Sequence, residues 1–93
     1  MAVVFGQKST QTVRGKVSDI ESNSSLPGAS VVLTRQGFEK ATATDADGNF
    51  SMSGIEVGRY NVKVSFVGYE TSELSEILVS SAKELFLDIK LKE

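Results

Sequence analysis

The sequence predicts an all-β sandwich of about seven short strands. Apolar and polar residues alternate with a period of two in most segments, as they do in half-buried strands. Gly, Pro, Asn and Asp separate these segments at roughly ten-residue spacing, which is typical of a sandwich. The 93 residues suit one domain, and the 40% hydrophobic and 24% charged contents are those of a globular protein.

The first two predicted strands cover residues 12–18 and 29–34. In each of them the odd-numbered residues are small or apolar and the even-numbered residues are mostly polar. One face of each strand is therefore expected to be buried. Residues 19–27, between them, are rich in Ser and Asn and predict a loop, which Pro27–Gly28 ends.

The next two strands are predicted on either side of a tight turn. Residues 40–44 alternate Thr with Ala, and Phe50 and Met52 point inward in the strand that follows. Between them, Asp45–Ala46–Asp47–Gly48 is a strong hairpin signal. Asp bonds nearby backbone N–H groups, and Gly accepts the positive φ that such turns need.

Residues 58–66 and 85–91 show the clearest alternation and predict two further strands. Residues 74–86 are ambiguous, because their apolar positions also fit an amphipathic helix. We expect a strand near residues 69–79 instead. Every neighbouring segment is β, and a helix would interrupt the alternation of the last strand.

The charged and chemically reactive side chains exclude several function classes. Ten basic and twelve acidic residues give a net charge of −2, and no three basic residues are consecutive. We therefore expect neither nucleic-acid binding nor binding to a membrane surface through a polybasic patch. We also expect no direct insertion of this domain into a membrane. The chain has no Cys and no His, which excludes disulfides, the usual zinc sites and Ser–His–Asp or Cys–His catalysis. We expect no cofactor and no enzyme activity.

The first residues suggest export. Residues 1–7 form a short apolar stretch in which Val4 and Gly6 fit the small-residue positions of a signal-peptidase site. We interpret residues 1–10 as a signal-peptide remnant or a flexible N-terminal segment, and residues 11–93 as the domain. An ordinary first strand is the alternative for the apolar stretch.

Asp45, Asp47 and Asn49 are candidate calcium ligands, because Ca²⁺ prefers oxygen ligands at alternate positions. The favoured interpretation is nevertheless a tight hairpin. A calcium loop of the EF-hand type needs Gly at its sixth position, whereas Gly48 is fourth from Asp45. We expect no metal.

Two further groups are candidate interaction surfaces. Because the strand at residues 40–44 is short and polar, we expect Lys40, Thr42 and Thr44 at a sheet edge that is open to strand addition. Tyr69 follows a glycine turn and is the better candidate for contact with a sugar. Tyr60 lies on an apolar face, so we expect it in the core with its hydroxyl near an edge.

Several motifs, in this order along the chain, resemble a known family. They are Val13–Arg14–Gly15–Lys16–Val17–Ser18–Asp19, Leu26–Pro27–Gly28–Ala29–Ser30–Val31, Thr44–Asp45–Ala46–Asp47–Gly48–Asn49–Phe50, Gly58–Arg59–Tyr60 and Val64–Ser65–Phe66–Val67–Gly68–Tyr69. Together they resemble the carboxypeptidase regulatory-like domain over about residues 12–92. The version found at the N-terminus of TonB-dependent outer-membrane receptors of Bacteroidetes is especially similar.

The resemblance implies a seven-stranded Greek-key sandwich of the prealbumin-like, or transthyretin-like, type. It also implies a non-catalytic accessory domain on the periplasmic side of the outer membrane, as the N-terminal extension of a nutrient receptor. Its partners would be the plug and barrel of the parent protein, or neighbouring envelope proteins. The alternative is a carbohydrate-binding or stabilising module of a secreted peptidase or glycoside hydrolase.

Overall fold

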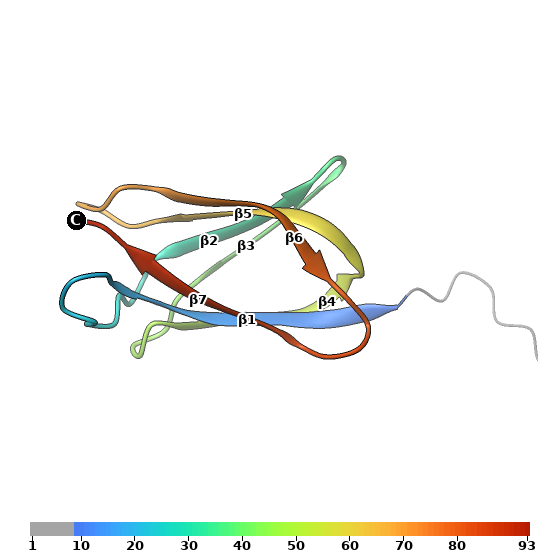
Figure 1. The fold of residues 1–93 in the computed structure, drawn as a ribbon, viewed down its shortest axis with the longest axis horizontal. Coiled ribbons are helices and arrows are strands. Elements are labelled where there is room, and N and C mark those ends of the chain that lie inside the picture. Colours follow the sequence, from blue (N-terminus) through green and yellow to red (C-terminus); the bar gives the residue numbers. More distant parts are fainter. Residues whose placement is uncertain (1–8) are drawn as a thin grey trace, which may run out of the picture.

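The computed structural model describes residues 9–93, which form seven strands and no helix (Figure 1). In chain order the strands are β1 (Thr10–Asp19), β2 (Ser30–Arg35), β3 (Phe38–Ala43), β4 (Asn49–Glu56), β5 (Gly58–Ser65), β6 (Ser72–Val79) and β7 (Leu85–Leu91). The predicted all-β class and the number of strands are confirmed.

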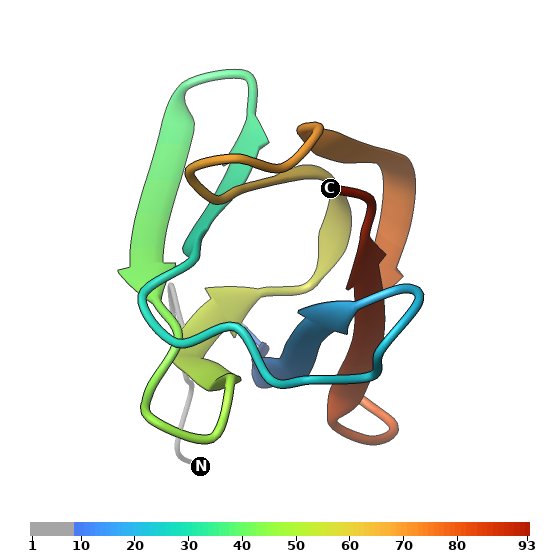
Figure 2. The ribbon, with the colours of Figure 1, turned by 90° about the vertical axis from the view of Figure 1, so that its left-hand side faces the viewer.

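The strands form two sheets that pack face to face (Figures 1 and 2). One sheet has three strands in the order β4-β1-β7, and the other has four in the order β3-β2-β5-β6. Only β1 and β7 run parallel among these neighbours, and every other pair is antiparallel. The edge strands are therefore β4 and β7 in the smaller sheet and β3 and β6 in the larger one.

Alternation along the strands fills the space between the sheets with apolar side chains, as the sequence predicts. The buried core consists of Val13, Val17, Leu26, Ala29, Val31, Leu33, Phe50, Met52, Ile55, Tyr60, Val62, Val64, Val79, Ile89 and Leu91. The prediction for Tyr60 is confirmed. Its ring is buried, and its hydroxyl donates to the carbonyl oxygen of Glu56, the last residue of β4, at 2.6 Å.

The ambiguous segment at residues 74–86 contains most of β6 and the start of β7, not a helix. Most of its apolar side chains, among them Leu74, Ile77 and Leu85, pack against the core from the two strands. The expected strand near residues 69–79 is therefore confirmed in type, although it begins only at Ser72.

The turn at residues 45–48 is correctly predicted as a turn, but the prediction of a hairpin is wrong. The two strands that it joins belong to different sheets: β3 pairs with β2, and β4 pairs with β1. The turn therefore carries the chain across the sandwich. Turn residues specify a reversal of direction, whereas strand pairing depends on contacts distant in the sequence.

Gly48 is required at this crossing for two reasons. Its φ of +77° is a conformation that other residues rarely adopt, and a Cβ there would lie 2.7 Å from the carbonyl oxygen of Val17. Gly15 allows a second close approach, because a Cβ on it would meet the ring of Phe50 at 2.8 Å. Because neither glycine has a side chain, the elements around β1 can pack closely against it.

The proposed signal-peptidase site at Val4 and Gly6 lies outside the described residues. Within them, β1 begins at Thr10, one residue before the predicted start of the domain. The described residues also contain no helix that could span a membrane.

Candidate functional site

The candidate calcium ligands build a turn. One carboxylate oxygen of Asp45, Oδ1, accepts hydrogen bonds from the backbone N–H groups of Asp47 and Asn49, both at 2.9 Å. The backbone N–H of Gly48 donates to the carbonyl oxygen of Asp45, also at 2.9 Å. Residues 9–93 contain no cluster of three or more carboxylates able to hold a metal. The turn by itself accounts for the spacing of these residues.

The predicted surface on β3 is only partly a surface. β3 is an edge strand, as expected. Thr44, however, is 6% exposed, accepts from the backbone N–H of Ala29 at 2.8 Å and donates to the carbonyl oxygen of Leu26 at 2.5 Å. Its assignment to an interaction surface is therefore corrected, because its hydroxyl satisfies buried backbone groups. Thr42 is half-buried.

Lys40 lies on the inner face of β3, directly opposite the buried Leu33 of β2. Its ammonium group leaves the sandwich at the side and donates to the carbonyl oxygen of Ser53 in β4 at 3.1 Å. Lys40 therefore bridges the edges of the two sheets. An inward-pointing charge on an edge strand discourages the addition of another strand.

Tyr69 is half-buried and packs against the core. Its ring contacts the ring of Phe66 at a centroid distance of 5.6 Å, and its hydroxyl donates to Oδ2 of Asp19 at 2.6 Å. None of its described contacts involves Lys40, Thr42 or Thr44, so the four candidate surface residues do not converge on one site.

The bond between Tyr69 and Asp19 shifts the titration of both groups. The Tyr69 hydroxyl, with the backbone N–H groups of Ser22 and Glu21, holds the pKa of Asp19 below its ordinary value. The same bond, together with desolvation and the negative charge of Asp19, raises the pKa of Tyr69 to about 12. The pair fastens the β5–β6 loop to the end of β1.

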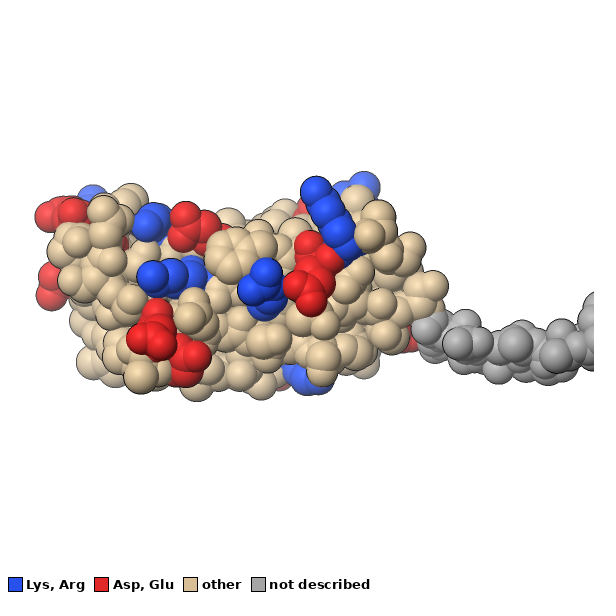
Figure 3. Space-filling model, turned by 90° about the horizontal axis from the view of Figure 1, so that it is seen from below, with Lys and Arg blue, Asp and Glu red and all other residues tan. Residues whose placement is uncertain are grey.

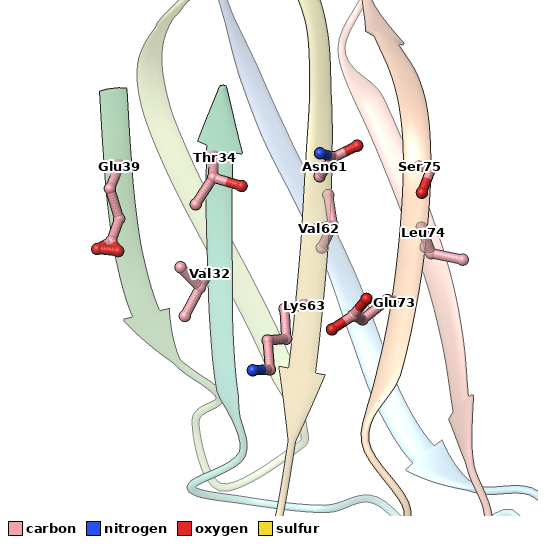
Figure 4. Close-up of a pocket in the computed structure, with 9 residues that line it drawn as sticks. All are labelled: Val32, Thr34, Glu39, Asn61, Val62, Lys63, Glu73, Leu74 and Ser75. Atoms are coloured by element: carbon pink, nitrogen blue, oxygen red, sulfur yellow. The ribbon is translucent and has the colours of Figure 1, made fainter. Parts of the chain in front are cut away.

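A groove of about 410 Å³ crosses the outer face of the four-stranded sheet (Figure 4). Val32 and Thr34 of β2 and Asn61 and Lys63 of β5 lie at its centre, with Glu39 of β3 and Glu73 of β6 at opposite sides. It offers carboxylate, ammonium, amide and hydroxyl groups above an apolar valine. A groove of this kind could hydrogen-bond a polar, uncharged ligand such as a saccharide.

Our sequence reasoning did not identify this groove. Alternation already places Asn61 and Lys63 on the polar face of their strand. What brings Glu73 opposite Lys63, and Glu39 opposite Thr34, is the pairing of β5 with β6 and of β3 with β2. These partners depend on the tertiary arrangement of the strands, so the only available signal was the polar face itself.

The residues with shifted pKa values do not form a catalytic arrangement. Asp19 and Tyr69 bond each other, and burial raises the pKa of Tyr60, whose hydroxyl bonds a carbonyl oxygen. Each of these groups is explained by the packing of the sandwich.

The hydroxyl of Ser18 does contact an amine, because Lys90 Nζ donates to its Oγ at 3.1 Å. Ser18 is only 2% exposed, however, and the same ammonium group donates to Oδ1 of Asn23 at 3.0 Å, so the contact links β1, β7 and the loop after β1. The whole chain lacks His and Cys.

The sequence matches the model of one family, the carboxypeptidase regulatory-like domain, over residues 12–92. No curated protein matches it. Among solved structures, the Bacillus anthracis TIE protein has a TM-score of 0.75 and 20% identity over 91% of this chain and 17% of its own. A candidate carbohydrate-binding protein from Bacteroides uniformis has a TM-score of 0.73 and 14% identity over 87% of this chain and 40% of its own.

A third structure is similar in length as well as in fold. The 5-hydroxyisourate hydrolase of Klebsiella pneumoniae has a TM-score of 0.69 and 17% identity over 88% of this chain and 84% of its own. The chain spans less than half the length of the other two proteins. At these identities the likeness concerns the fold, and the predicted transthyretin-like sandwich is confirmed.

Proposed function

Because the chain belongs to the carboxypeptidase regulatory-like domain family, we propose that it is a non-catalytic interaction domain at the N-terminus of a TonB-dependent outer-membrane nutrient receptor. It would lie on the periplasmic side of the outer membrane. There it would contact the plug and barrel of its parent protein, or neighbouring envelope proteins. The order of motifs from Val13 to Tyr69 supports this version of the family.

The observation that carries the proposal is that the polar side chains with notable contacts form hydrogen bonds within the sandwich. Hydrogen bonds inside the sandwich hold its turns and loops, and they involve Asp19, Thr44, Asp45 and Tyr69. These groups therefore do not form a catalytic arrangement among the described residues. Four strand edges and the two outer sheet faces are then the surfaces through which the domain can act. Such surfaces suit binding to other proteins.

The parent gene tests the proposal most directly. Translation of the sequence downstream of Glu93 should reveal a TonB box followed by a plug and a barrel. Deletion of this domain from that receptor should then reduce nutrient uptake while the barrel still assembles in the outer membrane. A peptidase or glycosidase domain downstream would overturn the receptor assignment.

The groove on the four-stranded sheet favours a second candidate, a carbohydrate-binding module of a secreted hydrolase. The likeness of the fold to the Bacteroides uniformis protein supports this candidate as well. Glycan-array binding that is lost in Asn61→Ala and Lys63→Ala, and kept in the matched variant Arg59→Ala outside the groove, would establish it. Absence of binding on the array would exclude the groove as a saccharide site.

A further inference from the structure

Three of the four edge strands carry features that discourage the addition of another strand. Lys40 points inward from β3 and bridges to β4. β4 is bulged, because Ser53 and Gly54 together oppose one residue of β1, and Gly54 has a φ of +69°. β6 has a similar bulge at Glu76, whose φ is +56°. Bulges twist an edge and break its hydrogen-bonding pattern.

β7 is the exception. All seven of its residues pair with β1 without a shift in register, and none has a positive φ. The backbone N–H of Ile20 donates to the carbonyl oxygen of Leu91, so the odd-numbered residues of β7 face β1. The N–H and C=O groups of Phe86, Asp88 and Lys90 therefore point away from the sheet. Among the described residues, these groups have no backbone partner.

The end of this edge is already used by the chain itself. The backbone N–H of Glu70, in the β5–β6 loop, donates to the carbonyl oxygen of Lys92 at 2.7 Å on the same free side. Backbone donors can therefore reach this side of β7. The contact also limits an added strand to the stretch from Phe86 to Lys90.

The side of the sandwich next to β7 is incompletely covered. On the opposite side of the sandwich, the edge strands β3 and β4 contact each other. The larger sheet has one more strand, so its other edge strand, β6, extends past β7 (Figure 2). The side chains of Leu74 and Ile77 on β6, and of Leu85 and Leu87 on β7, are only half-buried although they face inward. We call these four residues the apolar seam.

The outer face of β7 adds a charge pattern. Phe86 is 53% exposed and lies 5.4 Å from the guanidinium carbon of Arg14, while Asp88 and Lys90 follow it on the same face. Seen from below, the outer face of this sheet carries charges of both signs spread between uncharged residues (Figure 3). An added strand would therefore lie beside a hydrophobic position, a negative position and then Lys90, whose ammonium group also donates to Ser18 and Asn23.

We propose that an extended segment of another polypeptide adds to the free edge of β7. Its inward residues, opposite Leu87 and Ile89, would be apolar and would cover the apolar seam. Its outward residues would be basic opposite Asp88 and acidic opposite Lys90. This inference deepens the proposed function. It depends on that proposal only in the assumption that the domain binds another protein.

A second copy of the chain is a poorer partner for the same edge. The antiparallel register with the greatest overlap of two β7 strands places Asp88 directly opposite Asp88 of the other copy. Like charges in opposite positions destabilise a sheet. The edge therefore favours a different chain with complementary charges.

A synthetic peptide tests the proposal. It alternates valine with polar residues and carries glutamate and lysine where they face Lys90 and Asp88 in an antiparallel pair. Two N-methylated forms have the same sequence: one blocks the amides that face β7, and the other blocks those that face away. The first form should bind the 93-residue chain at least about tenfold more weakly than the second, because it loses the ladder hydrogen bonds.

Hydrogen exchange shows where the peptide binds. Binding should slow the exchange of the Phe86, Asp88 and Lys90 amides and leave the free-edge amides of β3, such as Ala41, unchanged. Equal affinity of the two methylated peptides, no binding, protection on β3, or dimers formed through β7 would each overturn the proposal. A parent gene that encodes no receptor would instead overturn the proposed function and leave these measurements unaffected.

Variants of the chain provide the control. Asp88→Pro removes only an N–H that faces away from β1, so the fold should be kept while peptide binding is lost. Ala41→Pro makes the matching change on β3 and should keep binding. If Asp88→Pro does not fold, Asp88→Lys tests the same site: it should weaken binding several-fold, and a peptide with glutamate at the facing position should restore it. Failure of that rescue would contradict the charge pairing.

Discussion

The two sides of the sandwich are closed by different means. Where β3 meets β4, Lys40 bridges to Ser53, and Arg35 forms an ion pair with Glu56 at 3.1 Å. The guanidinium carbon of Arg35 also lies 4.8 Å from the ring centroid of Tyr60. Polar links between the sheets thus cover the apolar residues on this side.

On the side of β6 and β7, the apolar seam is left half-buried, and hydrogen bonds connect the two sheets only near the two ends of the seam, among the described residues. Glu70 bonds Lys92 at one end, and the side-chain amide of Gln11 donates to the carbonyl oxygen of Ser80 at the other. One sandwich can thus protect one side against strand addition and leave the other side available. The two sheets differ by one strand, and this difference leaves the two sides covered to different extents.

Truncation of an isoleucine should have the largest effect and should separate the two sides. Ile55→Ala, on the β4 side, removes a side chain that is 1% exposed and should lower the free energy of unfolding by about 2–5 kcal/mol. Ile77→Ala, on the β6 side, should cost about 1–2 kcal/mol, because water already reaches that side chain. Urea unfolding measures both, and equal losses would contradict the comparison.

Alanine at two turn glycines should show the same contrast with a smaller effect. Gly48→Ala, in the β3–β4 turn, adds a Cβ 2.7 Å from a carbonyl oxygen at a positive φ and should cost about 2–4 kcal/mol. Gly68→Ala, in the β5–β6 loop, has a φ of +86° but no atom within 4 Å of the new Cβ. It should cost about 1 kcal/mol in thermal or urea unfolding. A larger loss at Gly68 would reverse this order.

Lys40→Val should change association more than stability. The substitution removes one surface hydrogen bond and leaves an apolar, β-branched residue on an edge strand, so the free energy of unfolding should change by less than about 1 kcal/mol. Self-association through β3 should rise, because the inward charge that protects the edge is gone. Light scattering at increasing concentration measures it, with Lys63→Val on the sheet face as the matched control. A monomeric Lys40→Val would show that other features protect this edge.

The Asp19–Tyr69 pair should give the smallest effect, visible in the pH dependence of the melting temperature. The folded pKa of Asp19 lies below 3.8, so its stabilisation is present above that pH and is lost as the pH falls through the folded pKa. The folded pKa of Tyr69 is raised to about 12 from 10.0, so its stabilisation is present below pH 10 and is lost between 10 and 12.

Tyr69→Phe should flatten both limbs of this profile, because the hydroxyl causes the largest part of each shift. Its effect should be greatest at neutral pH, where the wild-type bond is complete. Tyr60→Phe, whose hydroxyl bonds a carbonyl oxygen instead of a carboxylate, is the matched control and should leave the acid limb unchanged. An unchanged profile in Tyr69→Phe would show that the pair does not couple to folding.

Lys40 and Tyr69 show which features of the surface could be predicted from the sequence and which could not. The short polar segment at residues 40–44 was correctly expected at an edge. The role of Lys40 could not be predicted, because Ser53 becomes its partner only when β3 and β4 come together from different sheets. Tyr69 was expected at the surface for the same reason: its partner Asp19 is distant in the sequence. The groove and the free edge of β7 likewise depend on which strands become neighbours.

The amino-acid pattern alone predicts the all-β class, the approximate number of strands, the buried faces of the strands with clear alternation and the positions of most turns. These follow from alternation and from turn residues, which act over a few neighbouring positions. Three features appear only in the folded chain: residues 45–48 cross between the sheets, β7 runs parallel to β1, and the outer edge of β7 has no partner strand among the described residues. They depend on the whole chain because each strand exposes backbone groups on two sides, and the packing of all the strands selects which of these sides form hydrogen bonds.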